Sequence, residues 1–362
     1  MEPAPLRAIL ARTPGLVVRH LTLAARAANV TRLGPAIVPA LLALPLPRPT
    51  REWLEAPDSR LIDADLCSIE ANHYQILSIL DLGYPPALAR IDTAPALLYV
   101  RGNPTPLARP MLAIVGSPQA SPAGLDTVRR FAAELSHAGL GILSGLAEGI
   151  DTAAQYGVVA AGAGAIAVCT AGGDRIQPAR SAQLGALVAQ RGCLISRFAP
   201  GTPPHRHHFP LRNRLLAACG VGVLVVEARA GSGALSVAAQ ARAWQRRVFA
   251  VPGSIRDPLS RACNQLIRDG ATLVQQSGEL LTDLNLDNIQ EVTCAEAAPG
   301  EPPPLDNKYE MLLDAAGFEP VDIDILVART GWSGHLVTSM LLLLELRGRV
   351  APQPGGWYCR LS

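Results

Sequence analysis

The sequence predicts an α/β protein with an extended Rossmann-like fold, in which helices cover both faces of a doubly wound parallel sheet. From Met111 onward, short apolar runs alternate with helical stretches such as LDTVRRFAAELSHAG. These runs are continuously apolar, as strands buried on both faces are, rather than alternately polar and apolar. Most of them end in Gly or Ser, which is typical of the turn from a strand into a helix.

Six strands are expected from these runs: Leu112–Ser117, Gly141–Gly145, Ala165–Gly173, Cys193–Ser196, Val221–Ala228 and Arg247–Ser254. In a doubly wound sheet, ligands bind outside the carboxyl ends of the strands. The loops that follow these strands are therefore the first place to look for a site.

Different patterns flank this region, which we place at residues 76–290. Residues 1–75 contain short helices interrupted by prolines, and RTPGL (Arg12–Leu16) fits either a degenerate helix-hairpin-helix or a plain packing domain. A linker rich in Pro, Ala and Glu is expected at 291–304. Residues 305–362 contain two or three helices followed by two short strands around a Pro-Gly-Gly turn, the pattern of a winged helix.

The composition is that of a globular, cytoplasmic protein. Hydrophobic residues make up 49% of the 362 residues, and charged residues 17%. The seven cysteines are scattered without a CxxC pair, as expected of reduced core cysteines. No window is apolar enough for a membrane span, and MEPAPLRAIL lacks the features of a secretory signal, so no membrane partner is expected.

Three expected strand ends carry glycine-rich loops: Val115–Gly124, Ser144–Asp151 and Glu227–Leu235. Glycine lets backbone N–H groups approach an anion, and the helix that follows adds its positive N-terminal end. These loops favour a phosphate site, although helix–strand packing alone also requires glycine. None matches GxGxxG or a P-loop, so no nucleotide cofactor is expected. The candidate contact residues in the loops are Gly116, Ser117, Ser144, Gly145, Gly149, Ser232 and Gly233.

The strongest local signal is the basic stretch HRHHFPLRNR at residues 205–214. Residues 200–270 contain ten arginines against three acidic residues, an excess typical of a nucleic-acid backbone site. A solvated arginine surface is the plainer alternative. Three histidines could suggest a metal, but no Cys, Asp or Glu stands at ligand spacing, so no metal site is expected. The candidate DNA contacts here are His207, Arg212, Asn213 and Arg214.

No catalytic set is apparent in the sequence, and we expect a protein that is not an enzyme. The serines lack an ordered His and Asp partner set, and there is no GxSxG motif. Asp151 is expected to cap or tether the helix that begins at the second loop. Glu227 is expected to pair with a neighbouring arginine.

The motifs AIVGS, SGLAEGID, FPLRNR, VLVVEA, RVFAVPGS and NQLIRDGA occur in an order that resembles the DNA-processing protein A (DprA/Smf) family of natural transformation. The resemblance extends from Tyr84–Gly102 to Thr272–Leu284. It implies a homodimer that binds single-stranded DNA and loads the RecA recombinase, with an N-terminal helical domain and a C-terminal winged helix.

The sequence departs from the family pattern in three loops, one of which has SGALSV (Ser232–Val237) in place of an SGSLIT-like stretch. Pro118 and Glu148 stand where the family commonly has arginine, so Arg212 and Arg214 carry more of the expected DNA contact. One alternative is an enzyme that resembles nucleotide phosphoribohydrolases, but AGSGALSVAAQ lacks the acidic residue of their motif. Another is a repressor acting through the winged helix. It is disfavoured because residues 305–362 contain five basic and seven acidic residues, a balance that opposes duplex phosphates.

Overall fold

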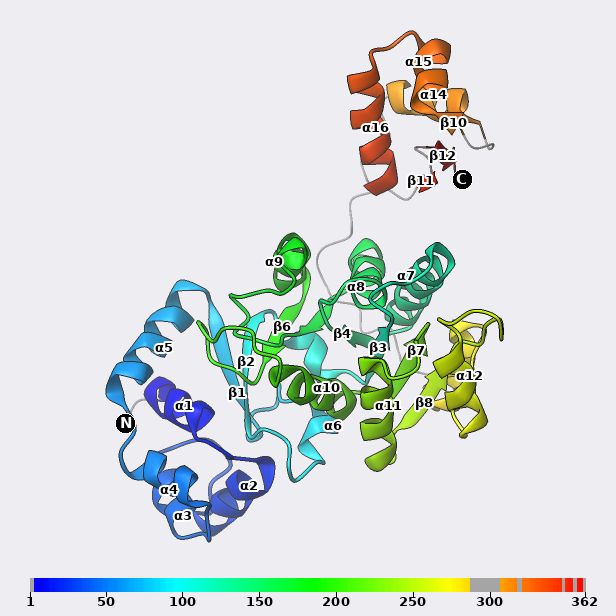
Figure 1. Ribbon diagram of the computed structural model, residues 1–362. Coiled ribbons are helices and arrows are strands. Elements are labelled where there is room, and N and C mark those ends of the chain that lie inside the picture. The colour runs from blue at the N-terminus through cyan, green and yellow to red at the C-terminus, as the bar shows by residue number, and fades with distance from the viewer. Residues whose placement is uncertain (1–2, 287–306, 318–320, 347–348, 354–356, 361–362) are drawn as a thin grey trace. The chain divides into compact units, whose positions relative to one another are not determined.

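The computed structural model describes residues 3–286, 307–317, 321–346, 349–353 and 357–360. The chain divides into two compact units, Met1–Val292 and Thr293–Ser362 (Figure 1). The expected linker at 291–304 and the expected Pro-Gly-Gly turn at 354–356 lie outside the described residues. The division of the first unit at residue 75 remains a prediction.

Five helices form the N-terminal part of the first unit. They are α1 (Pro3–Arg12), α2 (Val18–Ala27), α3 (Ile37–Leu42), α4 (Arg48–Glu55) and α5 (Ser59–Ala71). The turn between α1 and α2 includes Gly15, whose φ of 69° is left-handed and suits glycine. These helices share one apolar core with Tyr74, Ile76, Leu97 and Tyr99, so they pack directly on the sheet edge.

A nine-stranded sheet forms the centre of this unit, in the order β1-β2-β6-β5-β4-β3-β7-β8-β9. All six expected strands are present: β3 (Met111–Gly116), β4 (Gly141–Ser144), β5 (Ile166–Val168), β6 (Cys193–Ser196), β7 (Gly222–Val226) and β8 (Arg247–Ala250). They run parallel, as does the short β9 (Thr272–Leu273).

Three strands were not expected: the short β9 and two strands at the opposite edge of the sheet. The latter are β1 (Tyr74–Ser78) and β2 (Leu97–Gly102), and β2 pairs antiparallel with both β1 and β6. The doubly wound sheet is therefore parallel through β9 and extended by two antiparallel strands at the edge next to the N-terminal helices.

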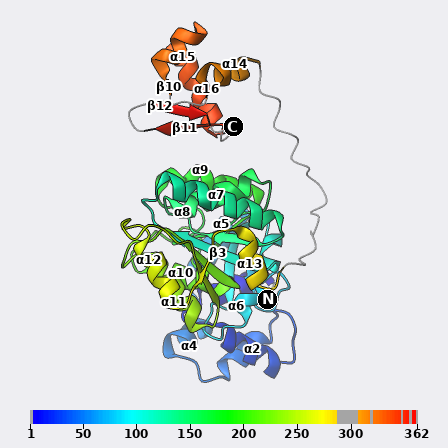
Figure 2. The same ribbon diagram turned by 90° about the vertical axis from the view of Figure 1, so that its right-hand side faces the viewer.

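Helices cover both faces of the sheet, and each face has its own apolar core. One core includes residues of α7 (Pro122–His137), α8 (Ile150–Ala160), α9 (Ala182–Arg191) and α13 (Ser277–Asp283). The other includes residues of α6 (Pro86–Ala89), α10 (His208–Cys219), α11 (Gly233–Ala243) and α12 (Arg261–Arg268). Figure 2 shows α7, α8 and α9 on one side of β3 and α10 and α11 on the other. Short 3₁₀ helices occur at Thr105–Ala108 and Ala179–Ser181.

The second unit contains a winged-helix arrangement with its own apolar core. Its elements are α14 (Asn307–Ala316), β10 (Val321–Asp322), α15 (Ile323–Thr330), α16 (Gly334–Leu346), β11 (Val350–Gln353) and β12 (Trp357–Arg360). The three strands pair in the order β10-β12-β11. Asp322 caps α15 by accepting a hydrogen bond from the backbone N–H of Ile325, and Gly331 ends the helix with a φ of 71°.

Candidate nucleic-acid interface

The carboxyl ends of β3 and β4 lie so close to the neighbouring backbone that their glycines are required by packing. A Cβ on Gly116 would lie 1.9 Å from the carbonyl oxygen of Val226, and one on Gly149 would lie 2.2 Å from that of Ser117. Gly149 also has a φ of 71°. Ser117 is buried and donates its backbone N–H to the carbonyl of Glu227. Here the alternative interpretation of the glycines, helix–strand packing, explains their presence.

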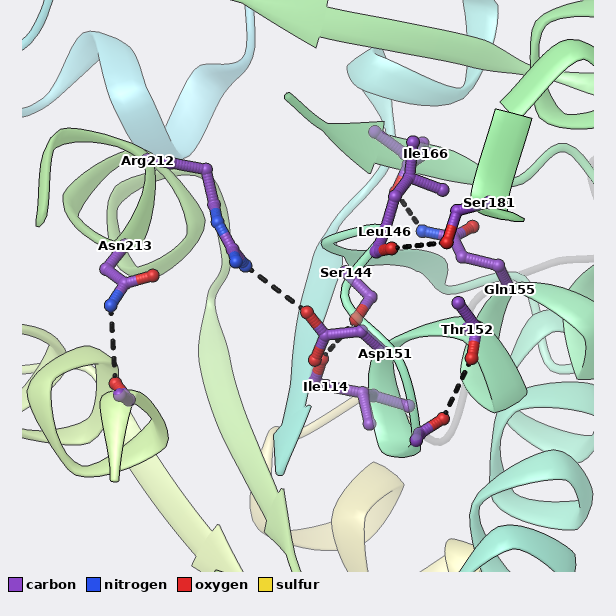
Figure 3. Close-up of polar contacts among 12 residues, drawn as sticks. Ile114, Ser144, Leu146, Asp151, Thr152, Gln155, Ile166, Ser181, Arg212 and Asn213 are labelled. Atoms are coloured by element: carbon purple, nitrogen blue, oxygen red, sulfur yellow. Dashed lines mark hydrogen bonds and ion pairs between the residues drawn. The ribbon is translucent and has the colours of Figure 1, made fainter. Parts of the chain in front are cut away.

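A buried ion pair lies behind the second loop. Arg212 of α10 reaches Asp151 in the first turn of α8, with 3.3 Å between Nη1 and Oδ2 (Figure 3). Only 8% and 6% of the two side chains is exposed, so this pair is shielded from solvent. Gly145 makes room for it, because a Cβ there would lie 2.4 Å from both charged groups. The expectation that Asp151 tethers the helix agrees with this contact.

Burial raises the pKa of the Asp151 carboxyl, while the charge of Arg212 opposes that rise. The backbone N–H of Gly145 also bonds the carboxylate. Ser144, at the end of β4, is fully buried and donates its hydroxyl to the carbonyl of Ile114, 2.6 Å away. Most buried polar groups at this strand end are therefore held by one another, but the buried Nε of Arg212 has no hydrogen-bond partner among the described residues.

A cavity of about 260 Å³ opens above this ion pair. Residues that follow β3, β4 and β5 line it together with Phe209 and Arg212 of α10. The guanidinium of Arg212 lies 5.9 Å from the Phe209 ring centre, and Phe209 is 45% exposed. The cavity thus has a buried cation and an exposed aromatic ring in its wall, a combination suited to a phosphate and a base.

Phe209 was not among the residues expected from the sequence. Its exposure in the first turn of α10 identifies it, whereas the letters FPLRNR alone are equally consistent with a core phenylalanine. The departure at Glu148 is also explained in part, because its carboxylate pairs with Arg180. The negative charge at this position therefore has a basic partner beside the cavity, which Glu148 also lines.

A second group of expected residues lies at the start of α11, where Asn213 donates its amide to the carbonyl of Gly233 at 3.3 Å. Figure 3 shows Asn213 pointing away from Arg212 toward this helix. Ser232 precedes α11, and its buried hydroxyl has no hydrogen-bond partner among the described residues. This hydroxyl is available to a ligand at the end of β7.

His207 and Arg214 lie apart from both groups, and both are exposed. His207 and its neighbours His205 and His208 form a ring cluster, with 4.0 Å between the ring centres of His205 and His207. His208 is buried and stacks on Phe198. Within the described residues, no group of three potential ligands could hold a metal ion.

The prediction that Glu227 pairs with a neighbouring arginine was wrong. The Glu227 carboxylate accepts hydrogen bonds from the backbone N–H of Ser121, at 2.7 Å, and from the Ser121 hydroxyl. Ser121 is the N-cap of α7. A carboxylate is favoured there because it faces the positive end of the helix dipole, and this contact replaces the expected arginine pair.

The segment that supplies Phe209, Arg212 and Asn213 carries basic side chains and no acidic ones. Residues 175–226 contain seven arginines and three histidines but no aspartate or glutamate. They include the loop after β6 and the whole of α10. A run this rich in basic residues and free of acidic ones is typical of a polyanion site, although one of its arginines, Arg191, precedes β6 and so lies at the other edge of the sheet.

A Rossmann-like sheet with a basic edge, together with a separate winged helix, defines the class of protein. A model of the DNA recombination-mediator protein A family matches residues 75–285, and a model of the DprA winged helix domain matches 296–356. The chain belongs to the DNA recombination-mediator protein A (DprA/Smf) family. The resemblance seen in the sequence is confirmed.

Relatives and solved structures agree with this assignment. The chain is 36% identical to protein Smf of Escherichia coli K12, over 87% of this chain and 84% of the relative. It is 39% identical to DNA processing protein DprA of Streptococcus pneumoniae R6, over 61% and 78%.

The X-ray structure of S. pneumoniae DprA matches with a TM-score of 0.66 at 32% identity, covering 78% of this chain and 99% of that one. The structure of Helicobacter pylori DprA, described for its single-stranded DNA binding mode, matches with a TM-score of 0.53 at 27% identity. It covers 59% of this chain and 96% of that one.

Proposed function

We propose that this chain binds single-stranded DNA across the carboxyl ends of β3, β4 and β5. The observation that carries the proposal is the cavity in which exposed Phe209 stands beside the buried cation of Arg212. The acid-free basic segment around it supports the same conclusion. The single-stranded DNA binding described for H. pylori DprA is further support from the family.

Each part of the site has a separate physical role. Stacking of a base on an aromatic ring contributes about 1–3 kcal/mol and does not depend on sequence. Arg212 lines the cavity with its charge already held in place by Asp151, so a phosphate that enters meets a preoriented guanidinium. A duplex hides its bases from such a ring, and this favours single strands.

We further propose, from the family, that the protein is cytoplasmic, works as a homodimer in natural transformation and loads RecA onto the bound strand. It would then act by binding rather than catalysis. The phosphoribohydrolase alternative is disfavoured because α11, which follows the glycine-rich loop after β7, carries no acidic residue in its first turn. No helix in the described residues is both long and apolar enough to cross a membrane.

A gel shift that compares single-stranded and double-stranded oligonucleotides at two salt concentrations tests the proposal. We expect tighter binding of the single strand and a salt slope of about −0.7 per phosphate contact. Phe209→Ala should weaken single-strand binding by roughly five- to 150-fold, the equivalent of one lost stacked base.

Tyr156→Ala is the matched control, because Tyr156 of α8 is 46% exposed and outside the cavity lining. Equal affinity of Phe209→Ala, Tyr156→Ala and the unaltered protein would place the site elsewhere. Release of free base from AMP by the purified protein would favour the enzyme alternative.

A further inference from the structure

A second, smaller cavity lies on the other side of α10 from Arg212. It has a volume of about 50 Å³ and is lined by Arg197, Arg214, Trp244 and apolar residues of α10 and the loop after α6. Arg197 follows β6 directly, and Arg214 lies on α10 two residues beyond Arg212. Two arginines therefore share one small cavity.

No acidic side chain balances this pair within the described residues. Arg197 is half-buried, and its recorded contact is with the ring of Phe198, 5.9 Å from the ring centre. Arg214 is exposed and forms no ion pair in the part of the chain that the structure describes. Burial lowers the pKa of Arg197, and the charge of Arg214 lowers it further. Because a guanidinium stays protonated in proteins, this repulsion is not relieved by loss of a proton.

Other arginines of this unit that are at least partly buried have polar partners. Arg7, Arg12, Arg51 and Arg212 each pair with a carboxylate. Arg101, Arg242 and Arg246 donate to backbone carbonyls. Arg197 differs from these arginines because it has neither a carboxylate nor a carbonyl partner among the described residues.

The cavity and the proposed DNA site lie on two sides of the same helix, α10. Strands β5 and β6 are parallel, so Arg197 lies at the same sheet edge as the glycine-rich loops. The same helix, α10, carries Phe209 and Arg212 on one side and Arg214 on the other. A strand that crosses α10 from the first cavity would reach the arginine pair.

We propose that Arg197 and Arg214 form a second phosphate site, which takes a backbone phosphate of the same single strand that stacks on Phe209. The inference rests on the proposed function. The planar fork of arginine matches the geometry of phosphate oxygens, and a bound phosphate would neutralise two cations that lack a carboxylate.

The test uses the full chain and measures both DNA affinity and thermal stability. Arg197→Ala should reduce single-strand affinity by roughly tenfold or more and lower the magnitude of the salt slope by about 0.7. The free protein should not lose stability, because the substitution removes a repulsion. Arg197→Glu should bring a carboxylate to Arg214, raise the melting temperature and lower DNA affinity further. Opposite changes in stability and affinity distinguish a ligand site from a structural one.

Arg191→Ala is the control. Arg191 is an exposed arginine of the same acid-free segment, but it precedes β6 and so lies at the opposite edge of the sheet. If Arg197→Ala binds DNA as Arg191→Ala does while Phe209→Ala is impaired, the second site is wrong and the proposed function stands. If the unaltered protein fails to bind single strands, both fail. If inorganic phosphate stabilises the unaltered protein but Arg197→Ala binds DNA with unchanged affinity, the site takes free phosphate and the assignment to DNA is overturned.

Discussion

At the residue scale, the space left by Gly145 decides how the candidate site is built. Any larger residue would place its Cβ within 2.4 Å of both Arg212 and Asp151. The missing side chain lets a helix from each face of the sheet meet through one buried ion pair. Removing one partner of such a pair costs about 3–5 kcal/mol, because the other charge stays buried without compensation. Arg212 is therefore both a structural residue and a candidate DNA contact.

His208 should make the stability of the protein depend on pH. Its ring stacks on Phe198 and its Nδ1 lies 2.9 Å from the carbonyl of Thr170. Burial lowers its pKa, and the nearby charges of His207, His205 and Arg197 lower it further, although the Thr170 contact opposes this. The unfolded chain therefore takes up a proton near pH 6.5 while the folded protein does not. Stability should fall as the pH drops below that value.

Denaturant unfolding between pH 7.5 and 5 checks this prediction. His208→Asn keeps a hydrogen-bond donor for Thr170 but does not titrate, so its stability should fall less over this range. Equal pH dependence of the two proteins would show that His208 is not responsible.

Part of this site could be predicted from the sequence. The positions of Ser144, Gly145 and Arg212 follow from strand ends and a basic run, and they do lie together. The partners of Glu227 and Arg212 could not be predicted. Glu227 contacts a residue 106 positions away and Arg212 one 61 away, and nothing local in the sequence specifies such pairs.

At the element scale, the predictable strands are those buried on both faces. Six continuous apolar runs identified β3 to β8. The strands β1 and β2 were missed because their antiparallel pairing with each other and with β6 is a long-range contact, outside the alternation of strand and helix from which the others were identified. Helix α10 was also missed, because its buried residues lie on several sides and its sequence shows no clear amphipathic stripe.

The attachment of α7 to the sheet should depend on Glu227. Its carboxylate binds the N-cap residue Ser121, whose hydroxyl in turn accepts from Gly124 at 3.0 Å. Glu227→Ala should lower the free energy of unfolding by about 1–3 kcal/mol, because it leaves donors without their acceptor. Chemical denaturation measures this.

Arg229→Ala provides the comparison, since it removes the exposed arginine nearest in sequence to Glu227. If Arg229→Ala loses as much stability as Glu227→Ala, Glu227 pairs with this arginine, and the contact with Ser121 is not what stabilises the protein.

At the scale of the whole molecule, the chain consists of two units with separate cores. The first contains the sheet, its helices and the candidate site, and the second is a winged helix with a core of its own. The N-terminal helices share a core with β1 and β2. The N-terminal helices are therefore coupled to the sheet by packing, whereas the winged helix has the means to fold by itself.

A chain that ends at Ala298 should stay folded and keep most of its affinity for single-stranded DNA. All the candidate contact residues precede the second unit, and the part removed from residue 305 onward has more acidic than basic residues. Its loss therefore removes no expected phosphate contact and slightly reduces repulsion of the strand. Binding titrations check the affinity, circular dichroism the fold and light scattering the oligomeric state. A large loss of affinity in a folded chain of unchanged oligomeric state would show that the winged helix itself holds the DNA.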